Sequence, residues 1–163
     1  MADHVADSAA GNLSAARRAT PEDAPIVARL LHDFNTEFDA ASPGVGVLAP
    51  RLRKLLASPT TFALLVGDRA EGVALVTLRT NVWYPGPVAL LDELYVTPDR
   101  RGQGLGSAMI LLLLDECRSL GVSAIEIGVD APDVDAQRFY ERHGFQGVDP
   151  DTGDRAFWYS LEL

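Results

Sequence analysis

The sequence predicts one α/β domain built on a mixed sheet, and three observations predict it. The chain has 163 residues, 47% of them hydrophobic, which is enough for a single compact core without disulfides or metals. β-rich runs occupy the middle of the chain, and segments with helical spacing of apolar residues lie on both sides. A glycine-rich segment joins one strand directly to a helix. The predicted order, β-α-α-β-β-β-α-β-α-β-β, is typical of a mixed α/β sandwich with one parallel step at its centre.

The N-terminal region predicts a tail and then a helix. Residues 1–14 are small, polar and aperiodic, so we expect a mobile tail, followed by a domain over 15–163. Thr20 provides a helix N-cap and Pro21 suits the first helical position, which predicts a helix from there to about Phe38. Its apolar residues recur at helical spacing: Ile26, Val27, Leu30, Leu31 and Phe34.

The next segments change from helical to strand periodicity. Residues 40–47 contain one proline and two glycines and predict a loop, and residues 50–57 predict a short second helix. Two β-rich runs, Thr61–Val66 and 73–80, are separated by a turn and predict an antiparallel hairpin. The remaining predicted elements are a strand at 88–96, a helix at 104–120 closed by Gly121, a strand at 124–129, a helix at 134–143, and strands at 145–148 and 157–161.

Composition excludes several classes of function. A net charge of -9 opposes nucleic-acid binding, which depends on lysine and arginine to neutralise phosphates. The longest apolar run, 109–114, is far shorter than the roughly 20 residues needed to span a bilayer, and the start of the chain does not resemble a signal peptide. We therefore expect a cytoplasmic protein. No cluster of His, Cys and Asp indicates a metal, and Cys117, the single cysteine, is predicted to pack as a small apolar side chain.

The segment between the third strand and the long helix carries the strongest chemical signal. Glycines at 102, 104 and 106 remove side chains where the backbone N–H groups of a helix's first turn point outward, and such a turn binds pyrophosphate oxygens. Arg100 or Arg101 could add a charge-assisted contact. A P-loop is excluded because no Gly-Lys-Ser/Thr follows. A dinucleotide fingerprint lacks its third glycine, and only 33 residues follow Asp130. A tight turn without a ligand stays open.

Two motifs in this order resemble those of the GNAT superfamily, the acetyl-CoA-dependent N-acetyltransferases. The string Leu-Tyr-Val-x-Pro-x-x-Arg-Gly-x-Gly-x-Gly resembles motif A, whose core signature here is Arg101-Gly102-Gln103-Gly104-Leu105-Gly106. Ala136-Gln137-Arg138-Phe139-Tyr140-Glu141-Arg142-His143-Gly144-Phe145 resembles motif B. The resemblance covers the chain from about Ala15 onward. It implies a GNAT fold, with a mixed sheet of about seven strands, a splayed parallel pair and about four helices.

The resemblance also implies how acetyl-CoA is held. The backbone of the strand would pair with the pantetheine arm, and the loop that follows would hold the pyrophosphate. The implied cofactor-binding residues are Leu94, Tyr95, Val96, Arg101, Gly102, Gln103, Gly104, Leu105, Gly106 and Ser107. Asp133 stands where relatives often carry an asparagine that binds the CoA arm, and here we favour a helix N-cap for it.

Catalytic roles follow from the same resemblance. Tyr140 stands where many members carry the general acid that protonates the departing thiolate, although packing beside Phe139 is an alternative. Asp92 aligns with the residue usually assigned as base, and Glu93 is the alternative. Because side chains alternate along a strand, we expect these two carboxylates to face opposite sides of the sheet.

The acceptor side is less specified. Relatives build the amine pocket from two regions, which here contain Phe34, Phe38, Trp83 and Tyr84. We expect transfer of an acetyl group from acetyl-CoA directly to a primary amine of a small cationic molecule, such as a polyamine, an aminoglycoside or an amino-acid derivative. A protein lysine or N-terminus, or a non-catalytic acyl-CoA-binding regulatory module, are the alternatives. A homodimer is compatible with an exposed terminal strand at 157–161.

Overall fold

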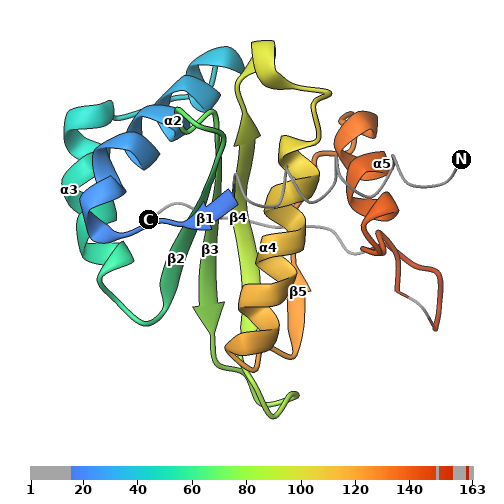
Figure 1. Cartoon of the computed structure of the whole chain (residues 1–163). Coiled ribbons are helices and arrows are strands. Elements are labelled where there is room, and N and C mark those ends of the chain that lie inside the picture. The colour runs from blue at the N-terminus through green and yellow to red at the C-terminus, as the bar shows by residue number, and fades with distance from the viewer. Residues whose placement is uncertain (1–15, 150, 156–160, 162–163) are drawn as a thin grey trace, which may run out of the picture. The chain divides into compact units, whose positions relative to one another are not determined.

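The computed structural model describes residues 16–149, 151–155 and 161 (Figure 1). The chain divides into two compact units, residues 1–126 and 127–163. Each is described on its own below. The predicted tail at 1–14 lies outside the described residues.

The first unit contains a five-stranded sheet in the order β1-β2-β3-β4-β5. β1 to β4 pair antiparallel and β4 pairs with β5 in parallel. The strands are β1 Ala16–Arg18, β2 Thr61–Val66, β3 Gly72–Arg79, β4 Val88–Val96 and β5 Ala124–Glu126. The helices are η1 Pro21–Asp23, α2 Ala24–Glu37, α3 Val45–Leu56, η2 Pro98–Arg100 and α4 Leu105–Ser119. The second unit contains α5, Val134–Arg142. The mixed sheet and four α-helices agree with the predicted fold class, with five strands instead of about seven among the described residues.

Helices cover both faces of the sheet because its central strands are apolar on both sides. β2 is buried along its whole length. Ala63, Leu65 and Val73 pack with residues of α2 and α3 in one core cluster. On the other face, the Met109 side chain of α4 lies against Gly72, where an added Cβ would come within 3.2 Å of it. Within this unit, α2 and α3 therefore cover one face and α4 covers the other (Figure 1).

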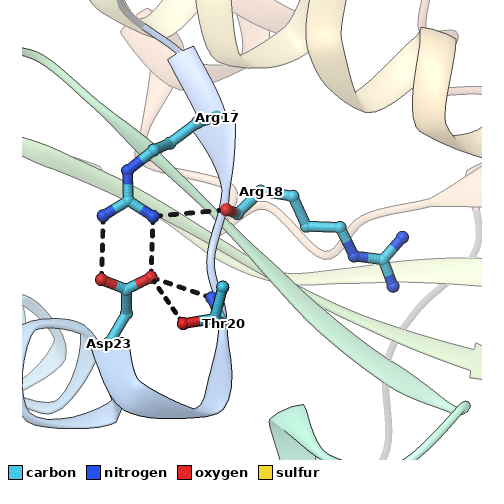
Figure 2. A network of polar contacts seen from close by, with 4 residues as sticks. All are labelled: Arg17, Arg18, Thr20 and Asp23. Atoms are coloured by element: carbon cyan, nitrogen blue, oxygen red, sulfur yellow. Dashed lines mark hydrogen bonds and ion pairs between the residues drawn. The ribbon is translucent and has the colours of Figure 1, made fainter.

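A polar network fixes the start of the first helical segment to β1. Arg17 donates two hydrogen bonds to the Asp23 carboxylate, Nη1 to Oδ2 at 2.7 Å and Nη2 to Oδ1 at 2.8 Å (Figure 2). The Thr20 backbone N–H also donates to Asp23 Oδ2, at 2.8 Å. The fork holds the pKa of Asp23 down at about 2 because the hydrogen bonds from Arg17 favour the ionised carboxylate.

Most predicted elements are confirmed within one or two residues, and three differ. The second helix begins at Val45, not at residue 50, because Gly44 adopts a φ of +88 and its carbonyl accepts the first helical hydrogen bonds, so Pro50 lies inside the helix. β5 ends at Glu126, three residues early, where its pairing with β4 stops. Residues 145–148 form no strand in the described chain, and most of the other predicted terminal strand, at 157–161, lies outside the described residues.

Two negative findings concern the described residues. None of their helices is long and apolar enough to cross a membrane. Within the same part of the chain, no group of His, Cys, Asp and Glu is arranged to hold a metal ion. Cys117 is buried in α4, as predicted for a small apolar side chain.

Candidate active site

The glycine-rich loop ends at the N-terminus of the 15-residue helix α4. Gly102 and Gly104 have φ values of +72 and +82, which are left-handed conformations that a side chain disfavours. Gly104 is the N-cap of α4, so the backbone N–H groups of the next residues have no partner within the helix. No other atom lies within 4 Å of a Cβ placed on Gly102, so the loop is open there. This geometry fits the pyrophosphate of CoA.

Arg101 connects this loop to helix α2. Its guanidinium donates Nη2 to Glu37 Oε2 at 2.8 Å, with Nη1 2.7 Å from Glu37 Oε1, and its Nε donates to the Val96 carbonyl at 2.9 Å. The guanidinium also lies 5.7 Å from the centre of the Tyr95 ring. Burial, with a smaller effect of the Glu37 carboxylate, raises the pKa of Tyr95 to about 12. Arg101 therefore holds the strand, the loop and α2 together; contact between Arg101 and pyrophosphate stays a prediction.

The parallel pair β4–β5 is paired over a short length. The three residues of β5 pair with Val88, Ala89 and Leu90 of β4, and the pairing ends at Leu90. β4 continues for six more residues, Leu91–Val96, beyond the last pair. This segment contains Leu94, Tyr95 and Val96, the residues whose backbone is predicted to pair with the pantetheine arm.

A β-bulge in β4 changes the direction of the acidic pair. Leu91 pairs with Val76 and Glu93 pairs with Leu75, so Asp92 is an extra residue with no partner opposite it. Val76 and Leu75 are neighbours on β3 and point to opposite faces, so Glu93 lies on the Leu75 face, which packs against α2 and α3.

Asp92 lies on the same face as Glu93. Its Oδ2 accepts a 2.6 Å hydrogen bond from Thr77 Oγ1, and Thr77 shares a face with Leu75 because the two are separated by one residue on β3. The prediction that Asp92 and Glu93 face opposite sides of the sheet is therefore wrong. Regular alternation does not apply across a bulge.

Glu93 lines a pocket between the sheet and helices α2 and α3. The pocket has a volume of about 250 Å³. Its walls are mainly apolar: Leu31, Pro43, Leu48, Leu52, Leu55 and Leu75. Asn35, Arg51 and Glu93 provide its polar groups. Burial, and to a smaller extent the Asp92 charge, raises the pKa of the Glu93 carboxyl above its ordinary value. A half-buried carboxyl with a raised pKa is better suited to accept a proton than an exposed one.

The four predicted acceptor aromatics fall into two groups. The Phe34 ring lies 5.3 Å from Tyr95 and 5.2 Å from Phe38, centre to centre, so the α2 pair forms a cluster with β4. Trp83 and Tyr84 belong to the loop before β4 and are 86% and 50% exposed. That loop and Tyr95 are separated by nearly the length of β4, roughly 20 Å at about 3.3 Å per residue. The structure does not bring the two groups together.

Tyr140 and Asp133 belong to the second unit. Tyr140 is buried between the rings of Phe139 and Phe145, whose centres lie 5.2 and 5.5 Å away. Asp133 Oδ1 accepts a 2.9 Å hydrogen bond from the Ala136 backbone N–H at the start of α5. The N-cap predicted for Asp133 is confirmed.

Comparison with known proteins identifies the family. The family model described as "Acetyltransferase (GNAT) family" matches residues 27–145, more than two thirds of the chain. This chain belongs to the GNAT acetyltransferase family. The GNAT acetyltransferase is 51% identical to a proposed acetyltransferase from Arthrobacter sp. FB24 of known structure, with a TM-score of 0.85 over 91% of this chain and 95% of that one. The predicted fold family and enzyme class are confirmed.

Two curated relatives differ in how much of them this GNAT acetyltransferase covers. It is 28% identical to an aminoalkylphosphonate N-acetyltransferase from Salmonella typhimurium over 133 residues, 80% of this chain and 83% of that one. It is 34% identical to a mycothiol acetyltransferase from Beutenbergia cavernae over 87 residues, 52% of this chain. The GNAT acetyltransferase spans only 28% of the length of that second relative.

The structure adds candidate site residues of this GNAT acetyltransferase that the sequence did not single out. Thr77 holds Asp92, and no pattern in the sequence marks it, because its role depends on the bulge. Asn35 and Arg51 line the Glu93 pocket. Arg51 precedes Leu52 and follows Leu48 by three positions, so helical spacing could have placed it beside an apolar face.

Proposed function

We propose that this N-acetyltransferase transfers an acetyl group from acetyl-CoA directly to the primary amine of a small molecule. The carrying observation is the bulge that puts Asp92 and Glu93 on one face of the sheet, where Glu93 lines the pocket. At about 250 Å³, this pocket is smaller than the roughly 300–1,000 Å³ of pockets that enclose drug-sized ligands, which favours a small acceptor. The Salmonella relative is named for a small amine and supports the same choice. Within the predicted classes, a polyamine or amino-acid derivative fits this volume better than an aminoglycoside.

Acetyl-CoA supplies the acetyl group as an activated thioester. In our proposal, the backbone N–H groups from Gly102 to Ser107 bind the pyrophosphate oxygens at the positive end of α4. The open space at Gly102 and the left-handed backbone of the loop support this role. The backbone of Leu94, Tyr95 and Val96 would hold the pantetheine arm, since β4 extends beyond its pairing with β5 at this point.

Glu93 is the proposed base. An ammonium substrate must lose a proton before its nitrogen can attack the thioester, and Glu93 lines the pocket while Asp92 is held by Thr77. The proton leaves the ammonium for the Glu93 carboxylate, directly or through one water. The neutral amine then forms the new C–N bond as the C–S bond breaks, the nitrogen releases its second proton to water, and Tyr140 recovers from water the proton that it gives to the thiolate. Asp92 assists by raising the proton affinity of Glu93.

Tyr140 is the proposed acid that returns a proton to the thiolate. A phenol with an ordinary pKa of about 10 holds its proton at neutral pH and can donate it to a thiolate. Packing of Tyr140 between two aromatic rings would keep its side chain in one orientation.

The test is thiol release from acetyl-CoA across polyamines, amino acids, aminoglycosides and peptides, with Tyr140→Phe measured alongside. We expect turnover on a small amine and a decrease in kcat in the variant of about 10²-fold or more. Calorimetry with acetyl-CoA should give equal affinities for both proteins. Acetyl-CoA binding without turnover on any amine would contradict the enzyme mechanism and favour a regulatory acyl-CoA-binding module. Absence of CoA binding would contradict the role of the loop.

A further inference from the structure

The Glu93 pocket has one feature that the transfer reaction does not need, a guanidinium group. Arg51 lies on α3 and lines the pocket together with Glu93 of β4. Among the described residues Arg51 forms no ion pair, whereas Arg17, Arg18, Arg29, Arg79 and Arg101 each lie within 3.4 Å of a carboxylate. An arginine that lines a mostly apolar pocket and has no protein anion is suited to bind an anion of the ligand.

The polar groups of the pocket are of opposite charge and are separated by apolar walls. Glu93 and Arg51 are its only ionisable groups among the lining residues, and six of the nine lining residues are apolar. The amide Nδ2 of Asn35 already donates to the Ala41 carbonyl at 2.7 Å. A ligand that matches this pocket has an amine for Glu93, an anionic group for Arg51 and an apolar body between the leucines.

This charge arrangement discriminates between acceptor classes. A polyamine would bring a second cation toward the positively charged Arg51 guanidinium, and the like charges would repel. A zwitterionic amine has a complementary charge at each end. Leucine side chains on α2, α3 and β3 favour an acceptor with an aliphatic or aromatic side chain over glycine-like compounds.

We propose that Arg51 is a specificity-determining residue that selects an acceptor bearing a carboxylate or similar anion beside its amine, on an apolar skeleton. This inference rests on the proposed function. Arg51 forms charge-assisted hydrogen bonds to the anion and places the amine nitrogen toward Glu93. Arg51 takes no part in proton transfer, so acetylation of an acceptor without the anion does not depend on it.

The experiment compares acceptors that differ only in the anion: L-leucine with 3-methylbutylamine, and L-phenylalanine with 2-phenylethylamine. Each pair is measured with the wild type, Arg51→Gln and a matched control, Arg53→Gln, which is exposed on the same helix and does not line the pocket. The ratio of kcat/KM within a pair, compared between proteins, cancels the difference in basicity of the two amines.

We expect the wild type and Arg53→Gln to prefer at least one amino acid over its decarboxylated partner by about tenfold or more, the effect of one charge-assisted contact. Arg51→Gln should lose about tenfold on that amino acid and stay within about twofold on the amine. A wild-type preference for the amines in both pairs, or an unchanged preference in Arg51→Gln, would overturn the inference.

Calorimetric titration of the same four compounds into the 163-residue chain with CoA present separates this inference from the proposed function. Binding that prefers the amino acid and depends on Arg51, without turnover of any amine, would uphold the pocket and contradict the acetyl transfer. Turnover of amines without a preference in kcat/KM or in binding would uphold the transfer and overturn the role of Arg51.

Discussion

The Thr77 hydroxyl donates a 2.6 Å hydrogen bond to the Asp92 carboxylate, across the bulge that separates Leu91 from Glu93. This bond gives the extra residue of β4 a fixed partner on β3. The two adjacent acids consequently lie on one face of the sheet. In a regular strand they would be on opposite faces. Burial, and to a smaller extent the neighbouring Asp92 charge, raises the pKa of Glu93.

The first prediction concerns the pH dependence of the reaction. A base must be ionised, and burial together with Asp92 raises the pKa of Glu93, so kcat/KM should rise with pH through a value above the ordinary carboxyl range. Asp92→Asn removes the neighbouring charge, which lowers the pKa of Glu93 and moves this acidic limb to lower pH. The burial effect, which is the larger, remains. Asp68→Asn, in the exposed β2–β3 turn, is the control. A limb that stays in place in Asp92→Asn would assign the titration to another group.

The second prediction is the loss of the base. Glu93→Gln keeps the shape of the side chain and removes its ability to accept a proton. We expect kcat/KM to fall by about 10²–10⁴-fold at neutral pH, with the acetyl-CoA affinity unchanged, because the loop at α4 is untouched. Stopped-time thiol release and calorimetry measure the two quantities. If Asp92→Asn is the more damaging change, Asp92 is the base and Glu93 assists it.

The third prediction concerns the backbone of the CoA loop. Gly104 has a φ of +82 at the N-cap of α4, so Gly104→Ala forces a side chain into the left-handed region. We expect the free energy of unfolding to fall by about 1–2 kcal/mol, and the acetyl-CoA affinity to fall with it.

Gly46→Ala is the matched control for that change. Gly46 is the second residue of α3, in its first turn, with no atom within 4 Å of an added Cβ. Alanine there should raise the free energy of unfolding by about 0.5–1 kcal/mol and leave CoA binding unchanged. Equal effects of the two substitutions in urea titrations would contradict the role assigned to the left-handed backbone at Gly104.

The fourth prediction tests the Arg17–Asp23 fork. The folded pKa of Asp23 is about 2 against an ordinary 3.8, so its ionised form stabilises the fold above the ordinary value, and this contribution disappears as the pH falls toward 2. Asp23→Asn should cost about 1 kcal/mol at neutral pH, since Arg17 is partly exposed, and progressively less below pH of about 4.

Asp33→Asn is the control for the fork. It removes a more exposed pair with Arg29, in which the two side chains are 46% and 42% exposed. The expected cost is at most about 0.5 kcal/mol. Denaturant titrations of both variants between pH 2 and 7 measure the difference. A cost for Asp23→Asn that does not change with pH would contradict the pKa argument.

Sequence reasoning predicted the elements well where one principle determined them. The strand Thr61–Val66 is continuous and apolar, and the strand Val88–Val96 is bounded by a proline-rich turn and Pro98, so both were predicted with their observed bounds. Helix α3 is longer than the predicted 50–57 because the left-handed φ of Gly44, and not Pro50, sets its start.

The site was predicted less completely than the fold. Residue type and order indicate the glycine loop and the acidic pair, but the direction of the two acidic side chains depends on the register between β3 and β4. Nothing in the string Leu91–Leu94 indicates that Asp92 is left out of the pairing, because the register is decided by β3 and by packing on both faces. Arg51 and Glu93 are 42 positions apart in sequence and line one pocket only because α3 packs on the sheet.

Arg101 contacts three groups, the Glu37 carboxylate, the Val96 carbonyl and the Tyr95 ring, and these contacts matter for any redesign of this enzyme. The Arg101 side chain links the end of α2, through Glu37, to the strand and loop that we propose bind CoA. We therefore expect libraries that remodel α2 to admit new amines to alter acetyl-CoA affinity, although they change none of the residues proposed to bind it. Selections that score only the new acceptor will misread such variants as poor catalysts. Measuring the Michaelis constants for the amine and for acetyl-CoA in every selected variant distinguishes poor amine binding from weakened acetyl-CoA binding.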